Sequence, residues 1–156
     1  MKKRYDLHTH TTKSDGTLSP EQLLKLAKEK GLSGLSITDH DTIAAYSEEM
    51  RSLAKSYDLT LISGAEITSK HRSLNVHVLG YGFSLEDAAF KSFLGKVQKV
   101  RQERNAMIYA YLKEYGILIK NEDFPRFLQN SSSVIGRLHI AKLLLDLGHV
   151  RSIQEA

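Results

Sequence analysis

The sequence predicts an α/β fold with a mostly parallel sheet in its first part and helices in its second. Up to about residue 84, short apolar segments alternate with segments of helical periodicity, which is the order that βαβ units produce. From residue 85 onward, the apolar residues recur at helical spacing. We therefore expect an N-terminal α/β part over residues 1–84 and a helical part over residues 85–156.

The α/β part has recognisable helix ends. Ser19 is a good N-cap, Pro20 suits the first helical position, and Gly31 suits the position after the last turn. Asp41 is an equally plausible N-cap for a second helix. The expected order is a strand through His8 and His10, a helix over 20–30, a strand over 34–38, a helix over 41–57, and strands over 59–62 and 75–83.

The helical part begins with residues 85–115, which predict one long helix, or two helices that break near Gly95. Gly116 ends this segment. A short helix at 122–128, a polar turn at 130–133 and a last helix at 135–147, ended by Gly148, should follow. The stripe expected to be buried on the long helix consists of Phe90, Phe93, Leu94, Val97, Val100, Ile108, Tyr111 and Leu112.

Composition narrows the class of protein. A chain of 156 residues suits one domain with a real core. The absence of cysteine excludes disulfides and thiolate metal ligands, and it fits a cytoplasmic protein. No stretch is apolar enough to cross a membrane, and no signal peptide is recognisable. The net charge of +4 mildly favours an anionic partner such as a phosphate ester or a nucleic acid.

Ligand-type side chains gather where the expected strands end. His8 and His10 are two residues apart, so on a strand they project to one face. Asp15 follows after a short turn, and His40 comes directly after the second expected strand. Each histidine could also be an ordinary structural residue, but their accumulation favours a metal site. Nitrogen and oxygen ligands suit Mn, Fe, Zn or Mg.

Two further residues extend this cluster. Glu66 follows the third expected strand, and a carboxylate is a natural bridge between two metals. His77 lies on the fourth expected strand, although a core histidine is an alternative. We interpret Asp39 as a turn or supporting residue and Asp41 as a helix cap, not as ligands.

These motifs together resemble the PHP (polymerase and histidinol phosphatase) superfamily. The resemblance is carried by Asp6-Leu7-His8-Thr9-His10, Ser14-Asp15-Gly16-Thr17, Ile37-Thr38-Asp39-His40-Asp41-Thr42, Gly64-Ala65-Glu66-Ile67 and Val76-His77-Val78-Leu79-Gly80-Tyr81. Arg101, Arg104 and the segment Ile135-Gly136-Arg137-Leu138-His139 resemble the helical insert of its small stand-alone phosphoesterases. That branch includes nucleoside 3′,5′-bisphosphate phosphatases and enzymes that trim short RNAs from the 5′ end.

The resemblance implies the N-terminal part of a distorted (β/α)7 barrel with two or three divalent metal ions. His8 and His10 would hold one metal, Glu66 would bridge it to a second that His77 also binds, and Asp15 and His40 would hold a third. A metal-activated water would hydrolyse a phosphoester of a nucleotide or short nucleic acid. Arg137 and His139 resemble phosphate contacts, with a surface arginine and a helix-face histidine as the alternative.

One departure from the family pattern stands out. Members of this branch carry a further His and an Asp-x-His pair, and neither follows His77 in the expected order. The resemblance therefore implies a fragment or a truncated relative that binds metal more weakly. Its open sheet edge would favour homo-oligomers. A non-catalytic PHP-type binding module and a histidinol-phosphate phosphatase stay open as alternative functions.

Overall fold

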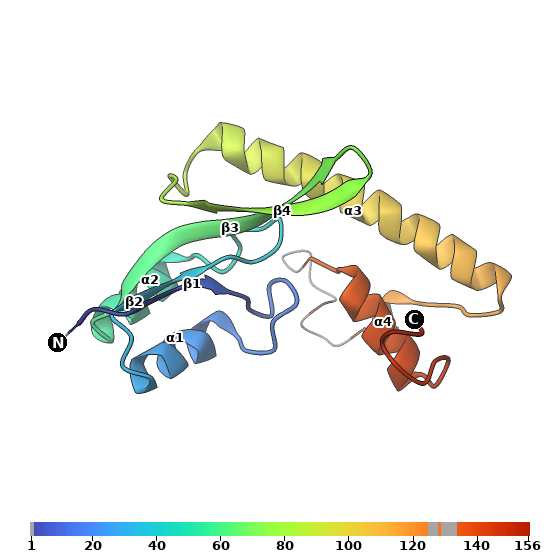
Figure 1. The fold of residues 1–156 in the computed structure, drawn as a ribbon, viewed down its shortest axis with the longest axis horizontal. Helices are drawn as coiled ribbons and strands as arrows, with labels where there is room; N and C mark the ends of the chain where they lie inside the picture. The colour runs from blue at the N-terminus through green and yellow to red at the C-terminus, as the bar shows by residue number, and fades with distance from the viewer. Residues whose placement is uncertain (1, 125–127, 129–133) are drawn as a thin grey trace.

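The computed structural model describes residues 2–124, 128 and 134–156, so the polar turn expected at 130–133 lies outside the described residues. Figure 1 shows the α/β part at the N-terminal end of the molecule and α4 at the other end, with α3 spanning between them. The elements are β1 (Tyr5–Thr9), α1 (Pro20–Glu29), β2 (Gly34–Ile37), α2 (Glu48–Ser56), β3 (Thr60–His71), β4 (Leu74–Tyr81), α3 (Ala88–Glu114), the short 3-10 helix η1 (Asn121–Asp123) and α4 (Arg137–Asp146).

The four strands form one sheet in the order β1-β2-β3-β4. β1, β2 and β3 are parallel, as βαβ units require. The sheet is therefore mostly parallel, as predicted, but β4 pairs antiparallel with β3. Only Arg72 and Ser73 separate these two strands, and so short a connection can join antiparallel neighbours only.

The sheet curls so that its two outer strands approach each other. The Tyr81 hydroxyl on β4 donates a hydrogen bond to the Leu7 carbonyl oxygen on β1, 2.8 Å away. β3 is also much longer than the expected strand over 59–62, so Glu66 lies within a strand instead of after one. The mixed α/β architecture is confirmed as a curled, half-barrel sheet.

The first helix has the predicted ends, whereas the second does not. Ser19 and Gln22 form a capping box at the start of α1, and Gly31 follows it with a positive φ of 65°. α2 begins at Glu48 with Ser47 as its N-cap, not at Asp41. Asp41 has a φ of 55°, and other groups occupy its carboxylate, so the helix cannot start there.

α3 is a single helix without a break at Gly95. The predicted apolar stripe is buried only in part: Leu94 is buried and Ile108 and Leu112 pack against the cluster around α4, but the other buried residues of α3, all of which is described, are Arg101 and Asn105. Val100 and Tyr111 are 64% and 58% exposed. In its middle the helix contacts the sheet through the buried polar side chains Arg101 and Asn105, whereas Ile108 and Leu112 pack toward α4. The helix expected at 122–128 is replaced by the shorter η1, although part of that range lies outside the described residues.

The apolar interior is divided into two separate clusters. One packs α1, β2 and α2 together around residues such as Leu24, Ile37 and Met50. The other packs α4 against the C-terminal part of α3 around Ile140, Leu143 and Leu144. The two clusters share no residue; between them, the Phe83 and Phe90 ring centroids lie 4.4 Å apart and Leu94 of α3 is buried, so apolar contact with the α/β part lies at the start of α3.

Tyr46 ties the carboxyl end of β2 to β3. Its hydroxyl accepts hydrogen bonds from the Ile37 and Gly64 N–H groups at 3.0 and 2.9 Å. The same hydroxyl lies 2.7 and 2.8 Å from the carbonyl oxygens of Ile37 and Ile62. Burial raises the pKa of Tyr46 to about 12, so the hydroxyl keeps the proton that it donates.

Replacing Tyr46 with Phe should lower the free energy of unfolding by about 1–3 kcal/mol, because two buried N–H groups lose their acceptor. Urea denaturation followed by circular dichroism measures this change. Tyr57→Phe is the matched control: its ring packs on the same apolar cluster, and its hydroxyl makes no hydrogen bond within the described residues. Equal stability of the two variants would contradict the bridging role.

Gly64→Ala should also destabilise the sheet, because an added Cβ would overlap the Ser36 hydroxyl and lie 3.1 Å from Thr38 Cγ2. Overpacking of this kind costs about 1–3 kcal/mol. Gly95→Ala on α3 is the control, since its added Cβ meets nothing within 4 Å, and it should raise stability slightly. If thermal unfolding shows that Gly64→Ala is tolerated as well as Gly95→Ala, the close approach of β2 and β3 is not required.

Candidate metal centre

Six side chains meet at the carboxyl ends of β1 and β2 and along the β3–β4 pair. His8 lies on β1 and His10 just beyond it, Asp15 lies in the following loop, and His40 follows β2. Glu66 and His77 come from β3 and β4. Parallel strands end at one edge of a sheet, which is why residues far apart in sequence converge here.

Glu66 is the centre of this cluster. Its Oε2 lies 3.1 Å from both His8 Nε2 and His10 Nε2, and 3.7 Å from His40 Nδ1. Its Oε1 lies 2.7 Å from His77 Nδ1. The carboxylate is 7% exposed, so it is held among four imidazoles with little access to solvent.

Asp15 completes a second group. Its Oδ1 is 3.4 Å from His10 Nδ1, and its Oδ2 is 3.5 Å from His40 Nε2. Three sets of donor atoms each lie within 4.8 Å of one another, namely His8, His10 and Glu66; His10, Asp15 and His40; and His40, Glu66 and His77. The sets overlap, so neighbouring ions could share ligands.

Asp39 supports the loop that carries His10 and Asp15. Its carboxylate accepts hydrogen bonds from the Thr11 N–H and hydroxyl, both at 2.6 Å, and from the Ser14 hydroxyl at 2.7 Å. Asp39 and Thr11 are fully buried. Asp39 thus fixes the loop conformation and is not part of the donor sets, in line with the supporting role expected from the sequence.

The histidines and carboxylates alter each other's acidity. Burial alone would raise the pKa of Glu66, but the imidazoles of His8, His40 and His77 outweigh it and lower the pKa. The hydrogen bond from His40 is the largest cause that lowers the pKa of Asp15. Burial lowers the pKa of His10. Both acids are therefore ionised at neutral pH, as metal ligands must be.

His40 carries the observation that best fits a metal. Its Nδ1 is buried and has no hydrogen-bond partner among the residues that the structure describes. A buried ring nitrogen without a partner is costly unless another group binds it. Together with two carboxylates and three other imidazoles, this nitrogen forms a donor set suited to Zn²⁺, Mn²⁺ or Fe²⁺. The residues present therefore fit divalent ions.

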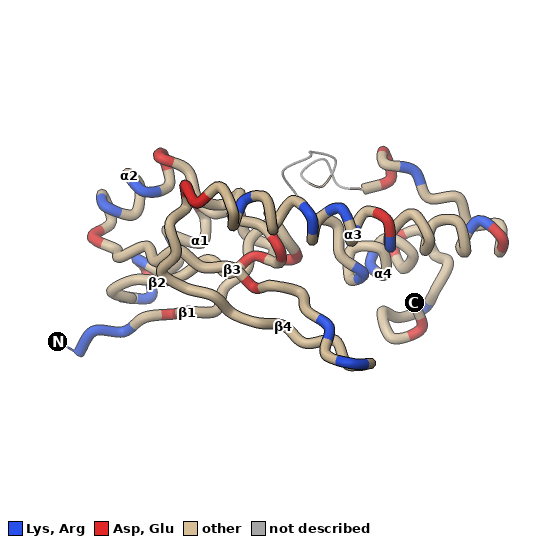
Figure 2. The backbone as a smooth tube through the Cα atoms, turned by 90° about the horizontal axis from the view of Figure 1, so that it is seen from above, with Lys and Arg blue, Asp and Glu red and all other residues tan. Residues whose placement is uncertain are grey.

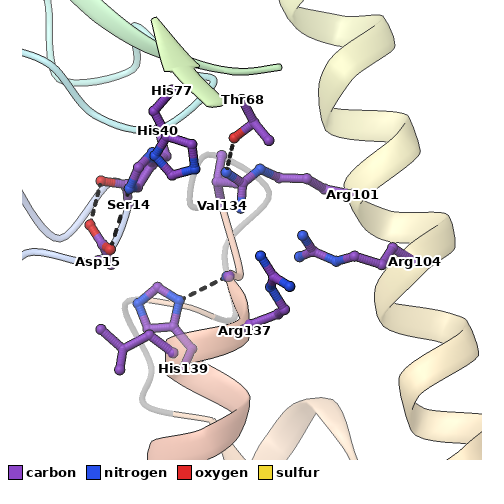
Figure 3. Close-up of a pocket in the computed structure, with 12 residues that line it drawn as sticks. Ser14, Asp15, His40, Thr68, His77, Arg101, Arg104, Val134, Arg137 and His139 are labelled. Carbon is purple, nitrogen blue, oxygen red and sulfur yellow. Dashed lines mark hydrogen bonds and ion pairs between the residues drawn. The ribbon is translucent and has the colours of Figure 1, made fainter. Parts of the chain in front are cut away.

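A pocket of about 140 Å³ adjoins the cluster (Figure 3). His40 and His77 lie on the sheet side, Arg101 and Arg104 come from α3 on the other side, and Arg137 and His139 come from the start of α4, with His139 below Asp15. In Figure 2 the basic positions in the middle of α3 lie beside the start of α4. Burial and the neighbouring charges of Arg101 and Arg137 lower the pKa of Arg104. This crowding of like charge favours an anion between the guanidinium groups.

The two residues that resembled phosphate contacts differ in their surroundings. Arg137 is exposed and lines the pocket. His139 is buried, and its Nδ1 accepts a hydrogen bond from the Gly136 N–H at 3.0 Å. Burial is the main cause that lowers the pKa of His139, so its ring is neutral and carries the remaining proton on Nε2.

Sequence reasoning did not place Asp41, Thr68 and Arg101 at this site. Asp41 is not the expected helix cap but a buried acid that pairs with Arg101. Thr68 accepts a hydrogen bond from the Arg101 guanidinium at 2.6 Å. The available signal was an arginine at helical spacing within an apolar stripe, which is unusual for a buried face unless the arginine is paired.

The chain matches the PHP domain family model over residues 6–146. It is 33% identical over 156 residues to a 5′-3′ exoribonuclease of Haemophilus influenzae, covering all of this chain and 56% of that protein. It is 28% identical over 149 residues to a 3′,5′-nucleoside bisphosphate phosphatase of Chromobacterium violaceum, covering 96% of this chain and 52% of that protein. The chain thus spans about half the length of these relatives.

Two solved structures have the same fold as this chain along nearly all of its length. A protein of Bifidobacterium adolescentis, assigned as a metal-dependent phosphoesterase, matches with a TM-score of 0.85 and 29% identity over all of this chain and 54% of its own. An amidohydrolase of Chromobacterium violaceum with bound sulfate matches with a TM-score of 0.83 and 27% identity, covering 97% of this chain and 52% of its own. With the family model matched along most of its length, the chain belongs to the PHP domain family.

Proposed function

We propose that this chain carries the metal-binding half of a phosphoesterase site that hydrolyses phosphate esters of nucleotides or short nucleic acids. The observation that carries the proposal is the overlap of three donor sets around Glu66, next to a pocket rich in arginine. The names of the relatives support the substrate class, since they act on RNA or on nucleoside bisphosphates.

The proposed metal ligands are His8, His10, Asp15, His40, Glu66 and His77. Two or three divalent ions would be held, with Glu66 shared between neighbours. Once bound, such ions supply Lewis acidity toward water and toward phosphoryl oxygens. Glu66 would keep the ions close together, and the Asp39 network would hold the His10–Asp15 loop in place before substrate arrives.

Arg104 and Arg137 would bind the phosphate of the substrate. Their guanidinium groups have planar, fixed donors that suit phosphate oxygens, and Arg104 Nε is buried without a hydrogen-bond partner in the described part of the chain. His139 would line the pocket as a neutral ring next to the Ser14 backbone, which interacts with it. The positive charge on this side of the pocket would offset charge on the phosphoryl group and orient the ester.

The decisive experiment measures hydrolysis of a nucleoside 3′,5′-bisphosphate and a short 5′-phosphorylated RNA by the purified chain, with and without Mn²⁺. Metal-dependent release of phosphate or nucleotides is expected. Histidinol phosphate serves as the competing substrate, and preference for it would overturn the nucleotide assignment. Metal binding without any turnover would instead favour a non-catalytic binding module.

Removing the shared carboxylate should weaken metal binding more than removing any single histidine does. Glu66→Gln should reduce Mn²⁺ affinity on the order of 100-fold or more, because changes around metal ligands alone cost about 10–100-fold. Isothermal titration calorimetry and elemental analysis measure affinity and stoichiometry. His71→Asn, an exposed histidine near the end of β3, is the control and should bind like the parent. Unchanged affinity in Glu66→Gln would reject the ligand set.

Metal should also stabilise the fold. If the ions bind the folded chain and not the unfolded one, Mn²⁺ at about 100 times its Kd should add about 2.7 kcal/mol per site to the free energy of unfolding. A thermal melt with Mn²⁺ or with EDTA reports this as a change in Tm. The same shift in Glu66→Gln would show that the ion acts elsewhere.

A further inference from the structure

Asp41 occupies an unusual position directly after His40. It is fully buried, and it adopts a positive φ of 55°, which a residue with a side chain rarely takes. Its N–H donates to the Glu66 carbonyl oxygen at 2.9 Å, and its Oδ1 accepts from the Thr68 N–H at 2.7 Å. Asp41 is therefore fixed to β3 through both its backbone N–H and its carboxylate.

The other side of Asp41 holds α3. Arg101 Nε donates to Asp41 Oδ2, and an Arg101 terminal nitrogen donates to the Thr68 hydroxyl at 2.6 Å. The Gln98 amide donates to the Asp41 carbonyl oxygen at 2.7 Å. Arg101 is only 9% exposed, so this is an enclosed ion pair with directed hydrogen bonds. Such a pair fixes geometry more than it adds stability.

This junction lies between the two halves of the candidate site. On the sheet side, Asp41 is the immediate neighbour of His40. On the helix side, Arg104 follows Arg101 by three residues and lies on the same face of α3. Asn105, which is also buried, donates to the Ile135 carbonyl oxygen at 3.0 Å and so holds the segment that leads to Arg137. Figure 3 shows Arg101 directed to Thr68, with Arg104 and Arg137 directed into the pocket.

We propose that Asp41 and Arg101 are positioning residues that set the distance between the metal-binding side and the anion-binding side of the pocket. The role rests on the proposed phosphoesterase function, but its geometric part does not. The two apolar clusters share no residue, and the apolar contact between α3 and the α/β part involves its first turns, at Phe90 and Leu94. Further along α3, beside the pocket, this polar junction fixes the orientation of the helix against the sheet. Neither residue needs to touch the substrate to act in this way.

A positioning role differs from direct contact between Arg101 and the substrate. If Arg101 bound phosphate through its charge, Arg101→Lys would retain much of the affinity, and Asp41→Asn would have little effect. If Arg101 positions α3, a lysine cannot make both contacts, so Arg101→Lys and Asp41→Asn should lose affinity together. Because the two residues act as one pair, the double variant should bind the substrate no more weakly than the single variant that has the lower affinity.

The geometric test uses the absence of cysteine in the chain. Spin labels on Glu29→Cys in α1 and Lys113→Cys in α3, both exposed, report the distance between the two parts by pulsed electron paramagnetic resonance. We expect one narrow distribution in the parent and a shifted or broadened one in Arg101→Met and Asp41→Asn. Lys99→Met, which removes an exposed charge from the same helix, should leave the distribution unchanged.

The functional test measures KM and kcat for a nucleoside 3′,5′-bisphosphate, together with Mn²⁺ titration. Arg101→Lys and Asp41→Asn should each raise KM at least tenfold while the number of bound Mn²⁺ ions stays the same. Unchanged distances and KM in both variants would overturn the proposal, as would losses that add in the double variant. Absence of turnover in the parent would reject the proposed function alone, since the label distances decide the positioning role independently.

Discussion

The candidate site depends on one buried carboxylate that gathers four imidazoles. Glu66 lies within hydrogen-bond distance of His8, His10 and His77 and close to His40. A buried charge of this kind is tolerated only when it is paired, so the histidines and the carboxylate must be arranged together. The curl of the sheet, the close approach of β2 and β3 at Gly64 and the Tyr46 hydroxyl all serve to hold that arrangement.

The molecule is stabilised by apolar clusters within its two parts and by hydrogen bonds and ion pairs between them. Apolar clusters stabilise each part internally, whereas the contacts between the parts combine the Phe83–Phe90 ring contact at the start of α3 with polar, directed hydrogen bonds beside the pocket. The Val134 N–H also donates to the Lys13 carbonyl oxygen, which ties the segment before α4 to the loop that carries Asp15. Polar junctions specify orientation because hydrogen bonds depend on direction, while apolar contacts do not. Directed contacts of this kind suit a pocket in which the histidine cluster and the arginines must keep a constant distance and orientation.

Local sequence signals predicted those features that depend on near neighbours. The ends of α1 were predictable because Ser19, Pro20 and Gly31 act within one turn of the helix. The same reasoning was wrong for Asp41, which was predicted to cap a helix. Its carboxylate instead binds Thr68 and Arg101, which are 27 and 60 residues away in the sequence. The stripe on α3 was predicted correctly for Leu94, Ile108 and Leu112 but not for Val100 and Tyr111, since apolar residues at helical spacing do not reveal which face the rest of the fold will cover.

Short motifs and their spacing were enough to predict the order of strands and helices, the family and the candidate ligands. Three other features became visible in the folded chain alone: β4 runs antiparallel, Glu66 lies inside a strand, and three arginines line one pocket with residues of the histidine cluster. The physical reason is that hydrogen bonds and ion pairs between distant residues carry no periodic signature. Their partners are chosen by the curl of the sheet and the placement of α3, which no local stretch encodes.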